Sequence, residues 1–593
     1  MVEVEEIIQN KKDSIKSLRK NENFIGAFRF FFFAVIIISL ILFYKPEPKE
    51  YFYLFAGLFS VGAFVILGVF LNKTQEQIKF DNNLIDICEN ILQDFPDDRD
   101  TTDPNLHHIY CLDLDILGKK SLFNKLNYTQ TNLGSERLNF FLLNHLIDPR
   151  KIKERQKAIQ ELSAKLNWSL KFLTTTKNLK INSQAISPPI SDIYSNSKML
   201  NFFLWIFASF NICFLVSLFF LNVSPLAKSI FFTTVIFISV LTSAIYNKRI
   251  KKILSSTAFK SNQYQQFLSA FSLIENEIFT SDMNNALKKK IYSETTGKST
   301  KAIKKLSQIL KYYEIGKIPI FGAILNVFIM WDLQFALRIE NQMQQMENEL
   351  PKWFDAFSEF EVLISFGIFA YKNPQYVYPT CSENPEELTI INIQHPLISS
   401  SNIISNNFST INKNNIAIIT GANMTGKSTF LRTIGVNLVL AMSGCPVAAD
   451  QFLFYPMTLF TSMRTNDSLS DDTSYFNAEI KKLKSLVESL EKRIPQYIIL
   501  DEILKGTNSH DKLIGSKLFL EKIMKLHSAF SCIIATHDLD LTKMEKEYPE
   551  NIKNYCFELH ENNQLLEPDY KLRLGVTKTM NAIQLMRQYK IID

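Results

Sequence analysis

Four apolar stretches decide much of what this 593-residue chain can form. They are Phe24–Tyr44, which carries one charge at Arg29, and the uncharged Tyr51–Leu71, Met199–Leu221 and Ser229–Tyr246. Each is about long enough to cross a ~30 Å hydrocarbon core as a helix, and a helix satisfies its own backbone hydrogen bonds in lipid. Because the links Lys45–Glu50 and Asn222–Lys228 are short, the stretches would pair as helical hairpins. We predict two transmembrane hairpins, with helices buried in soluble domains as the alternative.

Basic residues flank these hairpins on one side. They precede the first stretch at Lys11, Lys12, Lys16, Arg19 and Lys20, and follow the fourth at Lys248, Arg249, Lys251 and Lys252. Since such residues gather on the cytoplasmic side of a membrane, both termini and the segment between the hairpins are expected in the cytoplasm. The first stretch starts late and is paired at once, so a cleaved signal peptide is not expected. We predict an integral protein of the cytoplasmic membrane.

The seven cysteines and the net charge of +6 exclude few functions. No C-x-x-C pair occurs, so the sequence indicates neither a zinc site nor a disulfide framework. Scattered thiols fit a reducing compartment. A charge of this size permits nucleic-acid binding without arguing for it.

A glycine-rich loop at 421–428 fits the pattern G-x-x-x-x-G-K-[ST] of phosphate-binding loops. A buried strand, Ile416–Ile419, is predicted before it and a helix after it, which is the context that the pattern needs; the alternative is a chance match. Backbone N–H groups at the helix start would bind phosphate oxygens. We assign nucleotide binding to Gly421, Asn423, Met424, Thr425, Gly426, Lys427, Ser428 and Thr429. Lys427 would reach the outer phosphates as a catalytic group, and Ser428 would bind Mg²⁺.

Two further predicted strands end in polar residues. Tyr497–Leu500 leads into Asp501 and Glu502, and Cys532–Ala535 leads to His537. Asp501 would hold Mg²⁺ through water, and Glu502 would polarise the attacking water. A neutral His537 would donate a hydrogen bond to the γ-phosphate and sense its loss. The alternatives are an acidic pair that caps a helix and an ordinary surface histidine.

These motifs resemble those of the MutS family of DNA mismatch-repair ATPases. The matching residues are Asn423-Met424 within the loop, the segment from Asp501-Glu502 to Asp511, and Ala535-Thr536-His537. Weaker likeness continues in Ser121-Leu122-Phe123, Thr131, Gly134-Ser135, Leu138, Asp148-Pro149-Arg150, Glu154-Arg155-Gln156, His395-Pro396, Tyr570-Lys571-Leu572 and Gly575. The resemblance therefore covers roughly Ile116–Ala164 and Leu337–Ile592, and it implies ATP hydrolysis with Mg²⁺.

The resemblance also implies a dimer. Asp467–Ile480 keeps the spacing of the family's signature segment, with Ser474, Phe476 and Glu479 at matching positions. In such ATPases the serine reaches the γ-phosphate bound by the opposing subunit. Ser474 would then complete the partner's ATP site in a homodimer; a helix N-cap is a compatible second role.

Several departures limit what the resemblance carries over. Leu504, Lys505 and Lys512 differ from the family pattern, and Ala422 stands where the family usually has proline. The mismatch-reading domain is not expected before Ile116, because a membrane hairpin occupies that part of the chain. Phe357-Ser358-Glu359 matches the letters of the family's mismatch wedge, and we interpret the match as chance because it lies in a long helix near the ATPase.

Three functions remain open on the sequence. The first is an ATP-dependent clamp on double-stranded DNA, whose phosphates would be contacted by Lys288–Lys290, Lys301, Lys304 and Lys305 unless these line a solvated helix face. The second is a mechanical coupler or transport-like ATPase that moves the membrane hairpins without a DNA ligand. The third, a scaffold that binds ATP without turnover, is disfavoured by the intact catalytic groups.

The predicted fold class is a multidomain α plus α/β protein. A helical MutS-like core is interrupted by two transmembrane hairpins and followed by a P-loop ABC-type α/β ATPase domain. The expected parts are a cytoplasmic segment (1–23), hairpin 1 (24–72), core (73–198), hairpin 2 (199–246), helical lever (247–385) and ATPase domain (386–593). The polar segment 340–361 is expected as a long exposed helix or arm, and the partners are a second copy, DNA and the lipid bilayer.

Overall fold

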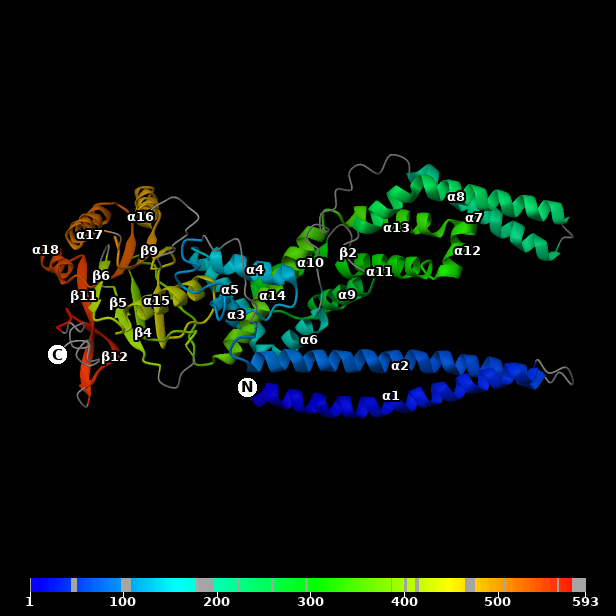
Figure 1. The fold of residues 1–593 in the computed structure, drawn as a ribbon, viewed down its shortest axis with the longest axis horizontal. Helices are drawn as coiled ribbons and strands as arrows, with labels where there is room; N and C mark the ends of the chain where they lie inside the picture. The colour runs from blue at the N-terminus through cyan, green and yellow to red at the C-terminus, as the bar shows by residue number, and fades with distance from the viewer. Residues whose placement is uncertain are drawn as a thin grey trace.

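The computed structural model describes residues 2–43, 51–96, 108–177, 179, 197–220, 224–256, 261–293, 297–385, 387–398, 403–410, 415–463, 475–505, 507–562 and 565–578. The molecule is elongated, with β-sheets at one end and long helices at the other (Figure 1). Within the described residues, four helices are long and apolar enough to cross a membrane. The prediction of a helical region followed by an α/β domain is confirmed.

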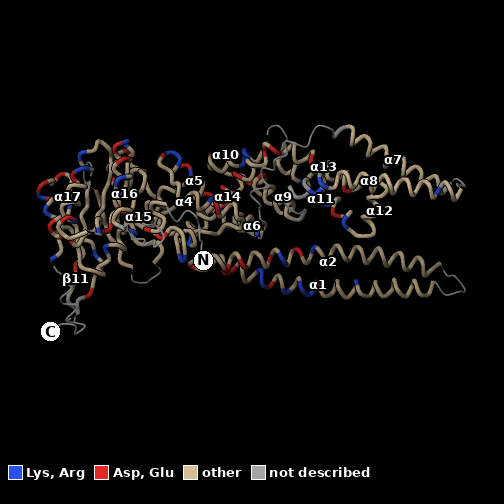
Figure 2. The backbone as a smooth tube through the Cα atoms, turned by 45° about the horizontal axis from the view of Figure 1, so that its top comes forward, with Lys and Arg blue, Asp and Glu red and all other residues tan. Residues whose placement is uncertain are grey.

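The first two helices form one long antiparallel pair. Helices α1 (Val2–Phe43) and α2 (Tyr51–Leu92) lie side by side (Figure 1). Charged residues are sparse in the half of the pair that is far from the core and frequent in the other half (Figure 2). We call the second half, residues 2–23 and 73–92, the stalk. Its helices pack through Val4, Ile8 and Ile15 of α1 and Leu84, Cys88 and Ile91 of α2.

The stalk also holds a buried carboxylate. Asp81 is fully buried and accepts hydrogen bonds from Lys11 Nζ at 3.0 Å and Ser14 Oγ at 3.3 Å. The stalk is tied to the rest of the chain by an ion pair between Lys177 and Asp86 and by a hydrogen bond from Tyr371 Oη to Glu3. Helix α1 runs without a break from the polar residues 2–23 into the first apolar stretch.

The second apolar pair is packed against other helices. Helices α7 (Ser197–Phe220) and α8 (Pro225–Ser256) contact α12 (Pro319–Ile329) and α13 (Trp331–Met346). Buried residues of α7, α8 and α13 form one cluster with Met330, and the partly buried Val327 and Phe328 of α12 pack against it; the buried members are Leu204, Phe207, Phe231, Val235, Met330, Leu333 and Leu337. Helices α7 and α8 are thus joined to α12 and α13, whereas α2 of the first pair contacts α6 through its stalk.

The helical core lies between the membrane-type helices and the sheets (Figure 1). It contains α3 (Leu122–Leu126), α4 (Asn132–Leu143), α5 (Pro149–Ala164), α6 (Leu166–Thr176), α9 (Ser261–Asn276), α10 (Asp282–Ile291), α11 (Ser299–Ile315) and α14 (Leu350–Lys372), with a short hairpin of β1 (Tyr292–Ser293) and β2 (Gly297–Lys298). Side-chain caps by Ser121, Thr131, Asp148 and Ser281 start α3, α4, α5 and α10.

The expected exposed helix at 340–361 is wrong. The segment is split between α13, which ends at Met346, and α14, which begins at Leu350, and α14 is a central helix of the core. Trp353, Phe357 and Phe360 are fully buried. The many Glu and Gln residues hid an apolar stripe, because composition takes no account of helical spacing. Since Phe357 is buried, it has no free side chain for a wedge.

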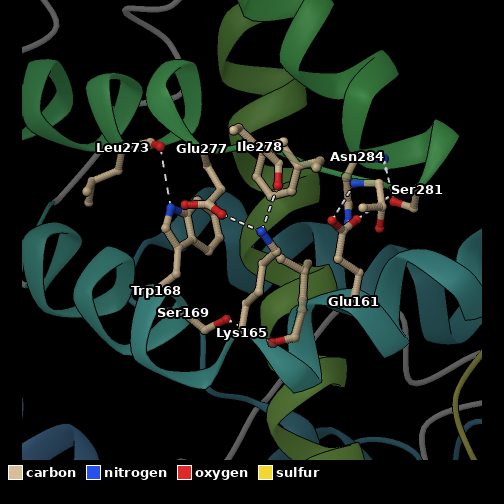
Figure 3. Close-up of polar contacts among 12 residues, drawn as sticks. Glu161, Lys165, Trp168, Ser169, Leu273, Glu277, Ile278, Ser281 and Asn284 are labelled. Atoms are coloured by element: carbon tan, nitrogen blue, oxygen red, sulfur yellow. Dashed lines mark hydrogen bonds and ion pairs between the residues drawn. The ribbon is translucent and has the colours of Figure 1, made fainter.

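A polar latch joins the core helices that precede hairpin 2 to those that follow it (Figure 3). The Glu161 carboxylate of α5 accepts hydrogen bonds from Ser281 N at 2.9 Å and Asn284 Nδ2 at 3.0 Å. Lys165 pairs with Glu277 and donates to the Ile278 carbonyl at 2.7 Å. Burial alone would raise the pKa of Glu161, but the hydrogen bonds outweigh it and lower the pKa. Glu161 therefore acts as an anionic cap on α10.

The α/β domain contains two sheets. Strand order in the larger sheet is β12 (Leu565–Leu574), β11 (Ile552–Asn562), β6 (Asn415–Gly421), β10 (Phe530–Ala535), β9 (Gln496–Asp501) and β8 (Thr458–Ser462), parallel except for β12. The smaller sheet is β3 (Thr380–Cys381), β7 (Gln451–Phe454), β4 (Leu388–Ile393) and β5 (Asn406–Ser409). Helices α15 (Lys427–Met442), α16 (Tyr475–Glu491), α17 (Ser509–Met524) and α18 (Met544–Glu547) and the 3₁₀ turn η3 (Leu539–Lys543) complete it.

Helix α15 connects the larger sheet to the helical core. It begins at the phosphate-binding loop and ends at Met442, whose carbonyl accepts a hydrogen bond from Leu146 N at 3.1 Å. Arg155 of α5 is buried beside this end, with its guanidinium 4.1 Å from the ring of Phe141. Burial lowers the pKa of Arg155 to about 10. One helix therefore spans from the loop to the α4–α5 corner of the core.

Candidate ATP site

Strand register brings the sequence-predicted site residues to one edge. Ala535 of β10 pairs with Ile419 of β6 on one side and with Asp501 of β9 on the other. Each of these strands is parallel, so their carboxyl ends meet at the same edge of the sheet, where α/β proteins bind ligands. The loop after β6, the acidic pair after β9 and the histidine after β10 are therefore neighbours.

The loop at 421–428 closes around its own lysine. Lys427 Nζ donates to the carbonyl oxygens of Gly421 and Ala422, each at 2.8 Å. Gly426 precedes α15 with φ of 100°, and a Cβ there would lie 3.0 Å from Cδ1 of Tyr570. Helix α15 starts at Lys427, so its first N–H groups face the loop. This is the geometry of a phosphate cradle at a helix N-terminus.

The pKa of Lys427 depends on its burial and on the charges around it. Burial lowers the pKa of Lys427 to about 8, while the carboxylates of Asp501 and Glu502 oppose the shift. Phosphate oxygens would favour the charged ammonium in the same way. The lysine is therefore placed where nucleotide binding would restore its full charge.

Glu502 sits between two cationic or potentially cationic side chains. Its Oε1 is 3.6 Å from His537 Nε2, and its Oε2 is 3.7 Å from Lys512 Nζ. Glu502 has a positive φ of 53°, which is uncommon for a residue with a side chain and is often found at functional sites. Its backbone N–H donates to the Ala535 carbonyl at 3.0 Å. The backbone of Glu502 is therefore fixed to the edge of the sheet, and its side chain starts from this fixed point.

His537 is poised as a neutral imidazole. Burial lowers the pKa of His537, and Lys427 lowers it further, whereas Glu502 acts in the opposite direction. The neighbouring Thr536 anchors this turn, because its backbone N–H donates to the Ile419 carbonyl at 3.0 Å. A neutral histidine here can donate one hydrogen bond to a ligand at the strand edge.

A cavity of about 270 Å³ lies beside the loop. Its lining includes His395, Phe430, Tyr570, Thr429 and Gly426, which come from distant parts of the chain. Burial lowers the pKa of His395 to about 4, so its ring is neutral at pH 7. Apolar and aromatic walls next to a phosphate cradle suit a flat heterocyclic base.

The oxygen donors of the site suit Mg²⁺. Ser428 follows Lys427 at the start of α15, and Asp501 ends the strand next to β10. A hydroxyl and a carboxylate are the hard ligands that Mg²⁺ takes together with substrate phosphates and water. Within the described residues, no group of three His, Cys, Asp or Glu side chains is placed to hold a metal ion.

Some site features lie outside the described residues or were not foreseen. Ser474, the predicted contribution to the partner's site, is outside them. The Lys512–Glu502 contact was not predicted, although Lys512 was noted as a departure from the family pattern. Glu479 was noted only for its spacing; it is buried and accepts a hydrogen bond from Leu504 N at 2.7 Å, so it positions the turn after Glu502.

The lysines considered for DNA contact divide into two groups. Lys288 donates to the Glu277 carbonyl at 2.6 Å, and Lys290 lies 3.9 Å from the Asp355 carboxylate. Lys301, Lys304 and Lys305 are exposed on α11. Lys289 and Lys290 of α10 are also exposed, so of the six lysines only Lys288 is partly buried and held by the core.

Comparison with known proteins identifies the α/β domain. Residues 417–591 match the family model of MutS domain V. MutS protein homolog 4 of Homo sapiens is 31% identical over 242 residues, which are 39% of this chain and 25% of that protein. DNA mismatch repair protein MutS of Fusobacterium nucleatum is 31% identical over 223 residues, which are 37% of this chain and 24% of that protein.

A longer match covers more of the helical region. DNA mismatch repair protein MutS of Thermotoga maritima is 23% identical over 510 residues, which are 80% of this chain and 62% of that protein. The chain spans about a quarter of the length of the first two relatives. Residues 417–591 therefore match a P-loop ATPase domain, MutS domain V, and this match implies ATP binding by that part of the chain.

Proposed function

We propose that this protein is a membrane-anchored ATP hydrolase of MutS type that uses ATP to move its helical arms and hairpin 2. ATP would bind in the loop at 421–429, with its base in the cavity beside Phe430. Glu502 would activate the attacking water, and His537 would report the γ-phosphate. Ser428 and Asp501 would hold Mg²⁺, which supplies charge neutralisation to the phosphates when bound.

A homodimer would complete the sites. The support is the likeness to MutS, in which the signature serine crosses to the opposing subunit. Ser474 would supply that hydroxyl, and each dimer would then contain two composite sites. Both termini and the ATPase domain would face the cytoplasm, with the four apolar helices in the bilayer.

The observation that carries the proposal is the packed route from the loop to hairpin 2. Helix α15 ends against the α4–α5 corner, and α5 holds the start of α10 through Glu161. Helix α11 continues from there to α12, which packs on α7 and α8. A displacement of α15 would be passed on through these hydrogen bonds and packing contacts.

The test uses the full chain in lipid nanodiscs. Asn211→Leu and Ser239→Val remove the hydrogen bonds that hairpin 2 makes to the α12 segment while keeping similar volume. Coupling predicts that the variant changes the ATP hydrolysis rate several-fold. Thr233→Val, which removes only a bond within α8, is the matched control. Equal rates in all variants would contradict coupling to hairpin 2.

Binding of double-stranded DNA is the second candidate function. It is favoured by the relatives, which are DNA mismatch repair proteins by name, and by exposed Lys301, Lys304 and Lys305 on α11. Fluorescence anisotropy with matched, mismatched and branched duplexes should show binding that weakens as salt rises. Reversing these three charges should weaken it, whereas reversing exposed Lys481, Lys484 and Lys492 near the ATPase surface should not. No salt-sensitive binding to any duplex would exclude this role.

A further inference from the structure

Helix α12 presents apolar side chains to its surroundings at the tip of two arms. Helices α11 and α13 form the arms, and α12 joins them near α7 and α8 (Figure 1). Ile320 is 80% exposed, and Phe321 and Ile324 are about half exposed. These positions fall on one face of the helix. A soluble arm would carry polar residues at such a tip.

The chain bends sharply before α12. The axes of α11 and α12 differ by 106°. Gly322 allows the bend, because a Cβ there would lie 1.7 Å from the Gly316 carbonyl oxygen. The helix has 11 residues and is about 16 Å long, which is too short to cross a bilayer. Because its axis is turned by 106° from that of α11, α12 lies across the direction of this arm.

The C-terminal half of α12 is covered by hairpin 2. Phe328 packs edge-on against Phe232 of α8, with ring centroids 6.2 Å apart. Asn211 of α7 donates to the Phe328 carbonyl at 2.9 Å, and Ser239 of α8 donates to the Asn326 carbonyl at 2.8 Å. These bonds satisfy carbonyls at the end of α12, as lipid requires. The C-terminal half of α12 is thus fixed to protein, whereas Ile320, Phe321 and Ile324 in its N-terminal half stay exposed.

The depth of these contacts follows from the spans. The apolar spans are Met199–Ser217 and Pro225–Lys248. At 1.5 Å per residue, Asn211 lies roughly 18 Å from the Met199 end and Ser239 roughly 14 Å from the Lys248 end. Half of a ~30 Å hydrocarbon core is about 15 Å. The end of α12 is therefore level with the middle of hairpin 2.

The nearby polar groups are arranged for this position. Lys317 at the bend reaches back along α11, with Nζ 4.9 Å from the ring centroid of Tyr313, in the direction of the helical core. A lysine stem can cross apolar surroundings while its ammonium reaches the headgroups. Asp332 is hydrogen-bonded to Asn326, through its backbone N–H at 2.9 Å and its carboxylate at 3.1 Å. Neither group interrupts the apolar face.

We propose that α12 is a re-entrant helix whose Ile320, Phe321 and Ile324 face lipid acyl chains. It would fasten the tips of α11 and α13 inside the bilayer beside hairpin 2. This inference rests on the proposed membrane anchoring, which it extends from four helices to the arm tips. An arm fastened in this way would transmit ATP-driven movement to the bilayer itself.

The test compares three isoleucines labelled one at a time in the full chain, reconstituted in phosphatidylcholine vesicles. Cys213 and Cys381 are replaced first, since the other cysteines are buried. A nitroxide is then attached at Ile320→Cys, at Ile66→Cys in the apolar half of α2, or at Ile278→Cys in the core. Ile278 is the matched control because it is 79% exposed, almost as Ile320 is. Power saturation measures the access of oxygen and of a water-soluble nickel complex.

Position 320 is expected to match position 66, with oxygen access several-fold above nickel access, and position 278 is expected to show the reverse. If 320 behaves like 278 while 66 is in lipid, the re-entrant helix is overturned and the anchoring stands. If 66 also behaves like 278, the anchoring itself fails. Low access of both reagents at 320, with dipolar coupling between labels, would assign the face to a second copy of the chain and also overturn the inference.

Discussion

The two apolar hairpins have similar composition but different surroundings. Helices α1 and α2 pack chiefly on each other, and their stalk meets the core through contacts such as Lys177–Asp86. Helices α7 and α8 share a buried cluster with α13, and α12 packs against it. A hairpin that packs mainly on itself is suited to anchoring, whereas one that packs on the arms must follow them. Under the proposed function, hairpin 1 would be the static anchor and hairpin 2 the moving element.

The largest expected effect is at Glu502. Glu502→Gln keeps the shape of the side chain but removes the base, so ATP hydrolysis should fall by about 10²–10⁴-fold while ATP still binds. Phosphate release and nucleotide retention measure the two quantities. Label pairs between each hairpin and the core should then show an ATP-dependent shift for hairpin 2 and none for hairpin 1. Equal shifts for both hairpins would refute the division of roles.

The latch at Glu161 should give the next largest effect. Glu161→Gln weakens the charged hydrogen bonds to the start of α10, at a cost of about 1–2 kcal/mol after allowance for partial exposure. Thermal unfolding of the full chain measures it, with Glu154→Gln, on the same helix, as the control. The distance shift at hairpin 2 should also shrink, while hairpin 1 stays unaffected.

The pH dependence of the latch has a definite sign. The pKa of Glu161 is lower in the folded protein than in the unfolded chain, where it is about 4.3. Its contribution is therefore complete above that value and is lost as the pH falls through the folded pKa. The melting temperatures of wild type and Glu161→Gln should differ at pH 7 and converge below pH 4. A constant difference would show that the carboxylate charge does not act in the latch.

A smaller effect is expected in the stalk. Asp81→Asn leaves Lys11 without its charged partner, and because Lys11 is about one-third exposed the cost should be roughly 1 kcal/mol. Denaturant unfolding of the full chain in detergent checks the value, and Asp13→Asn on the exposed side of α1 is the control. ATP hydrolysis should not change. A clear loss of activity would mean that the stalk also takes part in coupling.

The smallest expected effect is at Lys512. Lys512→Gly removes the cation beside Glu502 and should raise the hydrolysis rate by less than about tenfold, because the carboxylate is released toward water. Lys517→Gly on the same helix is the control, since its partner is Glu547. Steady-state phosphate release measures both. A rate that falls instead would show that Lys512 positions Glu502 productively.

Features that depend on neighbouring residues were predictable from the sequence. The strand before the loop, the helix after it and the acidic pair after the next strand all follow from short motifs, and β6, α15 and β9 confirm them. The apolar helices follow from length and hydropathy. Each of these signals is carried by a continuous run of the chain.

Features that depend on distant residues were not predictable. The cavity wall joins His395, Phe430 and Tyr570, which no local pattern connects. Lys512 was visible only as a departure, since its distance to Glu502 depends on how α17 starts. A membrane position for α12 was not predicted from the sequence, because a mostly apolar segment of 11 residues is too short to suggest a span. Its significance comes from packing on hairpin 2, which the sequence does not encode locally.

The length of the continuous helices α1 and α2 bears on the distance between the membrane surface and the ATPase domain. Residues 2–23 form the polar part of α1, so the stalk is roughly 30 Å long at 1.5 Å per residue. With the apolar halves in a bilayer, this length separates the ATPase domain from the membrane surface like a spacer. The layer beneath the domain is crossed by the stalk and by the arms, and it contains the exposed lysines of α11. Whatever those lysines bind must enter sideways through this layer, between the headgroups and the ATPase.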